Sequence, residues 1–278
     1  MIAFTPAKIN IGLFVTGRRN DGFHDLESIF IPIPWKDALE IQLQEEPGIQ
    51  LTTSGLPIPG VPEDNLIVKA YNLVARTHEL PGVKACVVKN IPLGAGLGGG
   101  SSNGAHMLRL LKESCSVNAT PDQWNQWAGA LGSDCPFFMQ DEAAMTYGRG
   151  ERIEPNPSIL THLKGWTIAI LHPGIHVSTR EAFAGIKPSP APFDLRELTT
   201  HRVEDWGSLI RNDFEKIIRE KHDAVNQAIV QHQQAGASYV QMTGTGSAVF
   251  GLFRNEKDAA KIARWGTERG WRAHCSAF

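Results

Sequence analysis

The glycine-rich stretch at residues 91–103 constrains this chain more than any other part of its sequence; it reads Ile-Pro-Leu-Gly-Ala-Gly-Leu-Gly-Gly-Gly-Ser-Ser-Asn. Five glycines fall within seven positions, a β-rich run at 83–89 precedes them, and a helix-like run begins at Gly104. Glycine allows positive φ angles and lets a ligand approach the backbone closely. The free N–H groups of a helix start attract anions. The sequence therefore predicts a strand, a turn and a helix that together cradle a phosphate group.

Three interpretations of this stretch remain open on its residues alone. The first is a surface turn without a ligand. The second is a dinucleotide site, because Gly94, Gly96 and Gly99 satisfy G-x-G-x-x-G; however, several strands precede the loop, and Asp122 lies at a helix start and not at a strand end. The third is a nucleoside triphosphate site without a Walker lysine, in which Ser101 and Ser102 cap the helix or contact phosphate and Mg²⁺.

Composition limits the class of protein without identifying it. The 278 residues are enough for one large or two moderate domains, and 42% hydrophobic with 20% charged residues is typical of a globular protein. A net charge of −2 gives no general attraction to nucleic acid or anionic membrane, so a phosphate site must be local. We expect no membrane span and no signal peptide. Four cysteines without C-x-x-C pairing indicate reduced thiols in a cytoplasmic protein.

Pro92 to Ser102 resembles the phosphate loop of the galactokinase, homoserine kinase, mevalonate kinase and phosphomevalonate kinase superfamily, the GHMP kinases. Two further motifs of that superfamily occur in the same order, Pro-Ala-Lys-Ile-Asn at 6–10 and Thr-Gly-Thr-Gly-Ser at 243–247. The resemblance covers nearly the whole chain. It implies an α+β fold of two domains, with a ribosomal protein S5 domain 2-like N-terminal domain at 1–156 and a ferredoxin-like C-terminal domain at 157–278.

The resemblance also implies ATP and Mg²⁺ as cofactors. It assigns the ATP phosphates to the backbone of the glycine-rich stretch, that is to Pro92, Leu93, Gly94, Ala95, Gly96, Leu97, Gly98, Gly99, Gly100, Ser101 and Ser102. Asn65 and Lys89 are expected on the adenine side. Asp64 is the expected N-cap of a helix over 66–80, whose apolar residues suit one helical face. No protein ligand of a metal is assigned.

Lys8 and Asp134 are the candidate catalytic residues. Lys8 and Asn10 lie two apart in a predicted strand, so they share one face of the sheet, which is also what an ordinary polar face looks like. Asp134 stands in Gly-Ser-Asp-Cys-Pro-Phe-Phe, where it is either a helix N-cap or, by resemblance, the catalytic aspartate. In the superfamily the matching lysine contacts the reacting hydroxyl and the transferred phosphoryl group.

Aromatic residues point to one branch of the superfamily, the kinases of 4-diphosphocytidyl-2-C-methyl-D-erythritol. Phe23-His24 follows an Asn-Asp-Gly turn where that branch has Tyr-His, so the aromatic ring for stacking is kept and a hydroxyl is lost. The run from His172 to Phe183 resembles the wall of the cytidine pocket. The resemblance thus implies the substrate-binding residues Asn10, Phe23, His24, Thr179, Phe183, Gly244 and Thr245.

The expected activity is ATP-dependent phosphorylation of the 2-hydroxyl of this cytidine diphosphate methylerythritol, a step of non-mevalonate isoprenoid precursor biosynthesis. The alternatives are a homoserine or mevalonate kinase, a non-catalytic nucleotide-binding protein of the same fold, and a nicotinamide-dependent reductase. We expect a small-molecule substrate, no nucleic acid or membrane partner, and a monomer or homodimer.

Overall fold

A computed structural model describes all residues, 1–278. The chain forms two compact units, each built from three segments. Unit 1 comprises Met1–Ala7, Pro34–Leu93 and Gly98–Asp141, and unit 2 comprises Lys8–Ile33, Gly94–Leu97 and Glu142–Phe278. The domain boundary near residue 156 stays a prediction.

The α+β class predicted from the sequence is confirmed. The strands are β1 (Ile2–Arg18), β2 (His24–Gln44), β3 (Ile49–Gly55), β4 (Gly82–Lys89), β5 (Ala144–Gly148), β6 (Arg152–Pro155), β7 (Thr167–His172), β8 (Tyr239–Met242), β9 (Val249–Phe253) and β10 (Arg272–Ala277). The α-helices are α1 (Leu66–Ala75), α2 (Gly99–Ser114), α3 (Pro121–Leu131), α4 (Cys135–Phe138), α5 (Ser158–Leu163), α6 (Thr179–Phe183), α7 (Trp206–Leu209), α8 (Glu215–Lys221), α9 (Asp223–Gln234) and α10 (Glu256–Glu268). Three short 3-10 helices are η1 (Pro62–Asp64), η2 (Leu195–Thr200) and η3 (Val203–Asp205). None of the helices has the length and apolar character needed to cross a membrane.

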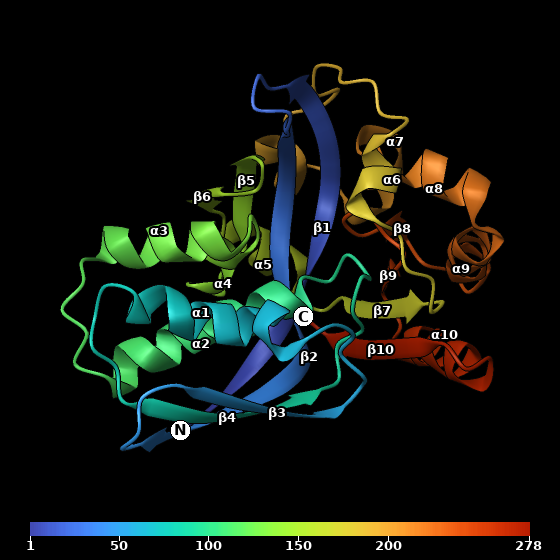
Figure 1. Cartoon of the computed structure of the whole chain (residues 1–278). Helices are drawn as coiled ribbons and strands as arrows, with labels where there is room; N and C mark the ends of the chain where they lie inside the picture. Colours follow the sequence, from blue (N-terminus) through green and yellow to red (C-terminus); the bar gives the residue numbers. More distant parts are fainter. The chain divides into compact units, whose positions relative to one another are not determined.

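Unit 1 packs helices against a small sheet. β4 pairs antiparallel with the C-terminal half of β2 and parallel with β3. The helices α1, α2 and α3 contact one another, and α1 also contacts β3 (Figure 1). The prolines and glycines of residues 45–62 predict loops alone, but 49–55 form β3. The sequence signal of this strand is weak, because its apolar alternation is limited to Ile49 and Leu51 and the residues after them are polar and exposed.

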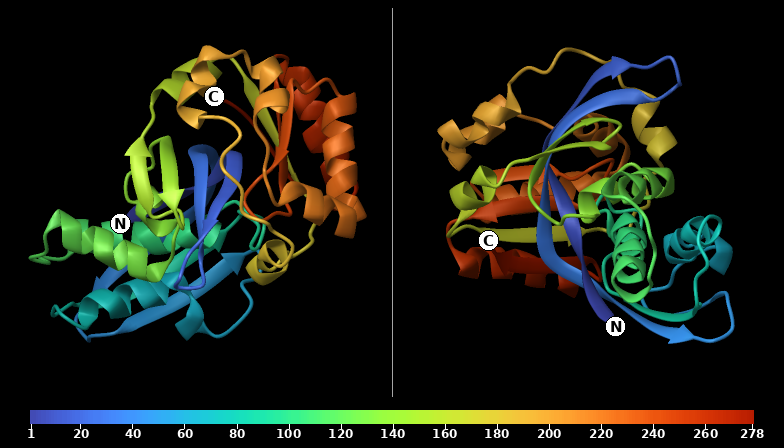
Figure 2. Two further views of the ribbon diagram at one scale, coloured as in Figure 1. Left: turned by 90° about the horizontal axis from the view of Figure 1, so that it is seen from above. Right: turned by 90° about the vertical axis from the view of Figure 1, so that its left-hand side faces the viewer.

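Unit 2 contains an antiparallel sheet in the order β10-β7-β9-β8. The chain order of these strands and of the helices α9 and α10 gives the βαββαβ arrangement of a ferredoxin-like fold, as expected. Both helices contribute to one hydrophobic core with the sheet, so they cover the same face (Figure 2). In the same unit, the N-terminal half of β2 pairs with β5, which pairs with β6.

Several boundaries differ from the predicted ones. Pro32, Pro34 and Trp35 predict two strands, over 28–35 and 37–43, but β2 is one continuous strand. α1 ends at Ala75 and not at residue 80. The sequence also predicts one helix over 214–234, which in the structure is divided at His222, where extended backbone ends α8 and precedes α9. These differences arise where tertiary pairing outweighs local propensity.

Candidate active site

The start of α2 in unit 1 provides an anion-binding terminus. The helix begins at Gly99, five residues earlier than the predicted start at Gly104. Gly98 is its N-cap with φ 69°, no side chain caps the helix, and no acidic residue lies in its first turn. The first intrahelical bond runs from the Ser102 N–H to the Gly98 carbonyl. The N–H groups of the first turn therefore have no partner within the helix and lie at the positive end of the helix dipole.

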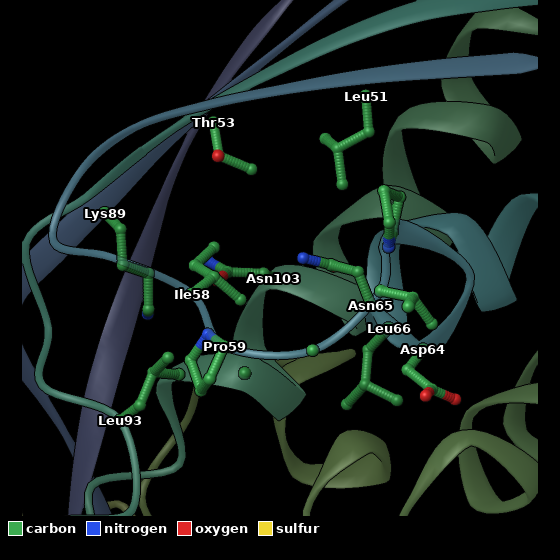
Figure 3. Close-up of a pocket in the computed structure, with 14 residues that line it drawn as sticks. Leu51, Thr53, Ile58, Pro59, Asp64, Asn65, Leu66, Lys89, Leu93 and Asn103 are labelled. Carbon is green, nitrogen blue, oxygen red and sulfur yellow. The ribbon is translucent and has the colours of Figure 1, made fainter.

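A cavity of about 450 Å³ lies beside this helix start within unit 1. Its lining is Leu51, Thr53, Ile58, Pro59, Gly60, Val61, Pro62, Asp64, Asn65, Leu66, Lys89, Leu93, Gly100 and Asn103. Figure 3 shows Lys89 and Leu93 on one side of it and Asn65, Leu66 and Asp64 on the other. A mostly apolar cavity with a few polar groups next to a helix N-terminus suits a nucleoside linked to phosphates. The cavity brings together four residues predicted for ATP: Asn65, Lys89, Leu93 and Gly100.

Asn65 is the N-cap of α1, a role that the sequence had assigned to Asp64. Its side-chain oxygen accepts a hydrogen bond of 2.9 Å from the Ile67 N–H. Asp64 instead ends η1 and pairs with Lys69 on the surface. The assignment of the cap was therefore wrong by one residue: α1 begins at Leu66 as predicted, and the residue directly before it, Asn65, is the N-cap, while Asp64 belongs to η1. The cap holds Asn65 at the edge of the cavity.

Asp37 is a buried acid that sequence reasoning missed. Its carboxylate accepts hydrogen bonds from the N–H groups of Asn90 and Ile91, both 2.7 Å, and from the Asn103 amide at 3.0 Å. It also forms an ion pair with Lys89, and both side chains are fully buried. Asp37 thereby ties the end of β4 to α2 just before the glycine-rich stretch. The sequence signal was its position among alternating core residues of β2, where an acid requires partners.

The ion pair with Asp37 holds the Lys89 side chain in place, because that side chain has no contact with solvent. Burial lowers the pKa of its ammonium group, and the neighbouring Asp37 carboxylate opposes that shift. A Cβ built on Gly99 would lie 2.8 Å from the Lys89 Nζ, so glycine is required there for the lysine to fit beneath the helix start. The lysine thus supports α2 while it also lines the cavity.

In unit 2, residues Gly94–Leu97 pack against the Thr-Gly-Thr-Gly-Ser turn. The Ala95 carbonyl accepts a hydrogen bond of 3.1 Å from the Ala248 N–H, and the Thr243 hydroxyl lies 3.3 Å from the Gly96 carbonyl. Gly96 has φ 76°, and a Cβ there would lie 2.0 Å from the Thr243 carbonyl oxygen. Two distant motifs of the sequence therefore meet in one unit, and their contact explains why Gly96 is glycine.

The Thr-Gly-Thr-Gly-Ser turn is held by Asn212, a second residue that the sequence analysis did not select. Its amide donates to the Met242 and Gly244 carbonyls at 2.7 and 2.8 Å. Gly244 has φ 57° and a Cβ there would lie 3.0 Å from Gly96. Thr245, the other predicted residue of the turn, is half-buried. The hydrogen bonds from the Asn212 side chain and the close approach of Gly96 thus fix the backbone of this turn without a ligand.

Lys8 and Asn10 form a buried polar group in unit 2. The Lys8 ammonium donates to the Asn10 side-chain oxygen at 2.6 Å and lies 4.4 Å from the centre of the Phe30 ring. Asn10 also donates from its amide to Ser28 at 3.0 Å, and its backbone N–H donates to the Thr243 hydroxyl at 3.0 Å. The predicted common face of Lys8 and Asn10 is confirmed by this contact. A buried ammonium group fixed by such contacts is suited to stabilise an anion.

Asp134 stands in unit 1 at the N-cap position of α4, but its side chain accepts no capping hydrogen bond. Asp134 therefore occupies the N-cap position without making a capping hydrogen bond, and its catalytic role stays a prediction. The adjacent Cys135 is fully buried, and burial raises the pKa of its thiol to about 12. That thiol remains protonated near neutral pH, so it is no nucleophile here.

The predicted aromatic residues for cytosine lie in unit 2. Phe23 is 52% exposed, in a turn where its N–H donates to Asp21 at 3.1 Å. His24 and Phe183 stack on each other with ring centres 4.7 Å apart. Thr179 is the exposed first residue of α6, which Ser178 caps by accepting a hydrogen bond from the Glu181 N–H. Of the residues predicted to bind cytosine, His24 and Phe183 are in direct contact in the structure.

The chain has no group of three His, Cys, Asp or Glu side chains that could hold a metal ion. Mg²⁺ usually keeps several waters and is held by substrate phosphates with one or two protein oxygens. Ser101 fits that mode, because its half-buried side chain places a hydroxyl oxygen in the first turn of α2. Ser102 does not fit it, because its side chain is fully buried and its hydroxyl lies 3.5 Å from the His106 Nδ1. The residues present do not fit a metal held by protein groups alone.

Comparisons with known proteins agree over nearly the whole chain. The model of the GHMP kinases N terminal domain matches residues 65–149, and that of the GHMP kinases C terminal domain matches residues 194–268. The 4-diphosphocytidyl-2-C-methyl-D-erythritol kinase of Bacteroides thetaiotaomicron is 41% identical over 96% of this chain and 97% of its own length.

Two solved structures have folds similar to that of this chain. A 4-(cytidine 5'-diphospho)-2C-methyl-D-erythritol kinase has a TM-score of 0.83 with 26% identity, over 99% of this chain and 98% of its own. The mevalonate kinase of Methanococcus jannaschii has a TM-score of 0.67 with 15% identity, over 100% of this chain and 98% of its own. The second likeness concerns the fold alone.

Proposed function

This chain belongs to the GHMP kinase family, and on that premise we propose how its residues phosphorylate 4-diphosphocytidyl-2-C-methyl-D-erythritol with ATP. The activity is an ATP-dependent step of non-mevalonate isoprenoid precursor biosynthesis. The observation that carries it is 41% identity, over almost the full length of both chains, to a relative of that name. The contacts within each unit then suggest a role for each part of the site.

The nucleotide is assigned to unit 1. The cavity takes the adenosine, with Asn65 and Lys89 at its rim. The free N–H groups at the start of α2 bind the phosphates, because they have no partner within the helix and no acid lies in its first turn. Ser101 would offer a hydroxyl oxygen to Mg²⁺, which neutralises charge on the phosphates when it is bound.

Lys8 and Asp134 are the proposed catalytic residues. Asp134 accepts the proton of the 2-hydroxyl as its oxygen attacks the γ-phosphorus of ATP; the bond from the γ-phosphorus to the β,γ-bridging oxygen breaks, and ADP leaves. Lys8 stabilises negative charge on the attacking oxygen and on the moving phosphoryl group. A general base of this kind typically contributes about 10²–10⁴-fold.

The cytidine end of the substrate is assigned to unit 2. Phe23 offers an exposed ring for stacking on cytosine, and His24 meets the polar edge of the base. Phe183, on which His24 stacks in the structure, is the proposed second ring for the base. The proposed contacts of the remaining part of the substrate are Asn10, Thr179, Gly244 and Thr245. The protein would act in the cytoplasm as a monomer or homodimer.

The competing activities are those of homoserine and mevalonate kinases and of a non-catalytic relative. A mevalonate kinase shares the fold at 15% identity, which does not carry its substrate to this chain. The presence of both Lys8 and Asp134 favours catalysis over binding alone. A nicotinamide-dependent reductase is disfavoured by the matches to both halves of the kinase family.

Analysis of the product tests this function directly. We would incubate the protein with Mg·ATP and the cytidine substrate, then identify the product by mass spectrometry and ³¹P NMR. One phosphomonoester on the 2-hydroxyl should appear for each ADP. A phosphate on another hydroxyl would contradict the acceptor assignment, and ADP without a phosphorylated alcohol would contradict the kinase reaction.

A further inference from the structure

The guanidinium group of Arg149 lies over the ring of Phe23, with 4.8 Å between its central carbon and the ring centre. Arg149 is in the turn between β5 and β6. The antiparallel register sets Leu26 opposite Gly148, so this turn runs alongside the residues that precede Leu26. The contact therefore follows from strand pairing within unit 2 and does not depend on a flexible surface encounter.

No acidic side chain pairs with the Arg149 guanidinium. Its Nε is buried without a hydrogen-bond partner, and the nearby Glu151 carboxylate accepts a bond from the Arg149 backbone N–H instead. Arginines at surface turns are commonly held by carboxylates, and Arg19 in the same region contacts both Asp21 and Asp25. Besides the hydrogen bond from the Phe23 N–H, the Arg149 charge helps to lower the pKa of the Asp21 carboxyl, but Arg149 forms no ion pair with Asp21, and its direct contact is with the Phe23 ring.

The backbone around Phe23 is fixed on its other side. The Asp21 carboxylate accepts the Phe23 N–H at 3.1 Å, and the Phe23 carbonyl accepts the Arg19 N–H at 2.9 Å. These bonds fix the main chain but leave the ring free to rotate about its side-chain torsions. The ring is 52% exposed, so packing against the core does not hold it either. A cation on one ring face restricts those rotations and leaves the opposite face for a base.

We propose that Arg149 is a positioning residue that holds the Phe23 ring for stacking on the cytosine of the substrate. The inference rests on the proposed function, in which Phe23 binds the base. It gives a physical basis for orienting a phenylalanine ring, which has no hydroxyl group. A tyrosine can be oriented through hydrogen bonds of its hydroxyl, whereas a phenylalanine offers only its ring face.

The test compares Arg149→Ala with Arg149→Lys and with a matched control. Arg152 lies on the same hairpin, and its guanidinium stands 5.7 Å from the Tyr147 ring. Arg152→Ala therefore removes one positive charge and one ring contact outside the proposed site. KM for the cytidine substrate, KM for ATP and kcat are measured for each variant, and thermal unfolding verifies that each one folds.

An exposed cation–π contact is worth enough to change KM about 2- to 5-fold. Arg149→Ala should raise KM for the cytidine substrate by that factor, with KM for ATP and kcat unchanged. Arg149→Lys should recover part of the loss, and Arg152→Ala should have no effect. An equal rise in Arg152→Ala would mean that only net charge matters, and an unchanged KM in Arg149→Ala would overturn the proposal.

The double variant separates this inference from the function on which it rests. In a Phe23→Ala background, Arg149→Ala should cause no further rise in KM, because the ring that it positions is gone. The same rise in both backgrounds would overturn the positioning role. If Phe23→Ala alone leaves KM unchanged, the assignment of the base to Phe23 fails, and the role of Arg149 fails with it. If Phe23→Ala raises KM and Arg149→Ala does not, only the inference about Arg149 fails.

Discussion

The proposed nucleotide cavity of unit 1 and the proposed cytidine site of unit 2 are built by different means. Beside α2, backbone N–H groups and fully buried side chains define the cavity; Asp37 and Lys89 have no exposed side-chain surface. In unit 2, Phe23 is half exposed and touches Arg149 across a surface turn. The proposed phosphate-binding end is therefore a property of the fold, whereas the proposed base-binding end depends on a few side chains that can change without disturbing the fold.

This contrast indicates where specificity can change within such a fold. Substituting a glycine or buried acid around α2 would affect folding and nucleotide binding together. Substituting a surface aromatic residue in unit 2 would affect the choice of acceptor alone. Single substitutions in the two units, together with a change of pH, can therefore test whether the two ends are independent.

Asp134→Asn should lower kcat by about 10²–10⁴-fold, because the amide cannot accept the hydroxyl proton. KM for ATP should stay within about 2-fold, since the start of α2 is unchanged. Steady-state measurement of ADP release with the cytidine substrate gives both parameters. A kcat near that of the unsubstituted enzyme would remove Asp134 from the role of base.

Gly96→Ala should damage the fold, because the new methyl group meets the Thr243 carbonyl and the backbone must keep φ 76°. Strain and overpacking together suggest a loss of about 2–6 kcal/mol in the free energy of unfolding. Urea denaturation measures it. Gly129→Ala is the control: Gly129 lies in α3 with open space where a Cβ would stand, and alanine there should add up to about 1 kcal/mol. Equal stability of both variants would show that the Gly96 contact does not constrain the fold.

Phe23→Ala should raise KM for the cytidine substrate by about 5- to 150-fold, the range expected for loss of one aromatic stacking contact with a base. KM for ATP should not change, because the nucleotide cavity is lined by other residues. Phe23→Tyr is the conservative comparison and should keep substrate binding. Initial-rate kinetics with each substrate varied in turn would reveal a shared effect on both KM values, which would contradict the separation of the two ends.

Acid should destabilise the protein through His232, which is fully buried in unit 2. Burial lowers its pKa to about 4, below the usual value of 6.5, although the Ala228 and Ala169 carbonyls oppose the shift. The unfolded chain therefore binds the proton first as pH falls. The stabilising contribution is complete above about pH 6.5 and is lost toward pH 4, by up to about 1.4 kcal/mol per pH unit.

Urea denaturation at pH 7, 6 and 5 would measure this slope. His232→Gln should show a shallower fall in the free energy of unfolding than the unsubstituted protein does over the same range. Burial also lowers the pKa of His172 and His274 to about 4, so part of the slope should remain in the variant. An identical slope in both proteins would contradict the assignment to His232.

Local sequence patterns were sufficient for much of the fold and for part of the site. The spacing of Lys8 and Asn10 predicted their common face, and the glycine-rich stretch predicted a turn that leads into a helix, which is α2. Phosphate binding at that helix start stays a prediction. Asp37 was missed because its four partners come from β4, the two residues after it and α2, and such contacts appear only once the chain folds. β3 was missed because its exposed polar residues carry no periodic signal and its partner in parallel pairing follows a helix.

The choice of acceptor alcohol tests most directly whether the proposed nucleotide cavity and the proposed cytidine site work independently. ADP release with Mg·ATP would be measured with 4-diphosphocytidyl-2-C-methyl-D-erythritol, homoserine and mevalonate under the same conditions. We predict turnover with the cytidine substrate alone, and a loss of that preference in Phe23→Ala. Comparable kcat/KM for homoserine or mevalonate would contradict this prediction, because an acceptor without a base makes no use of the aromatic site in unit 2.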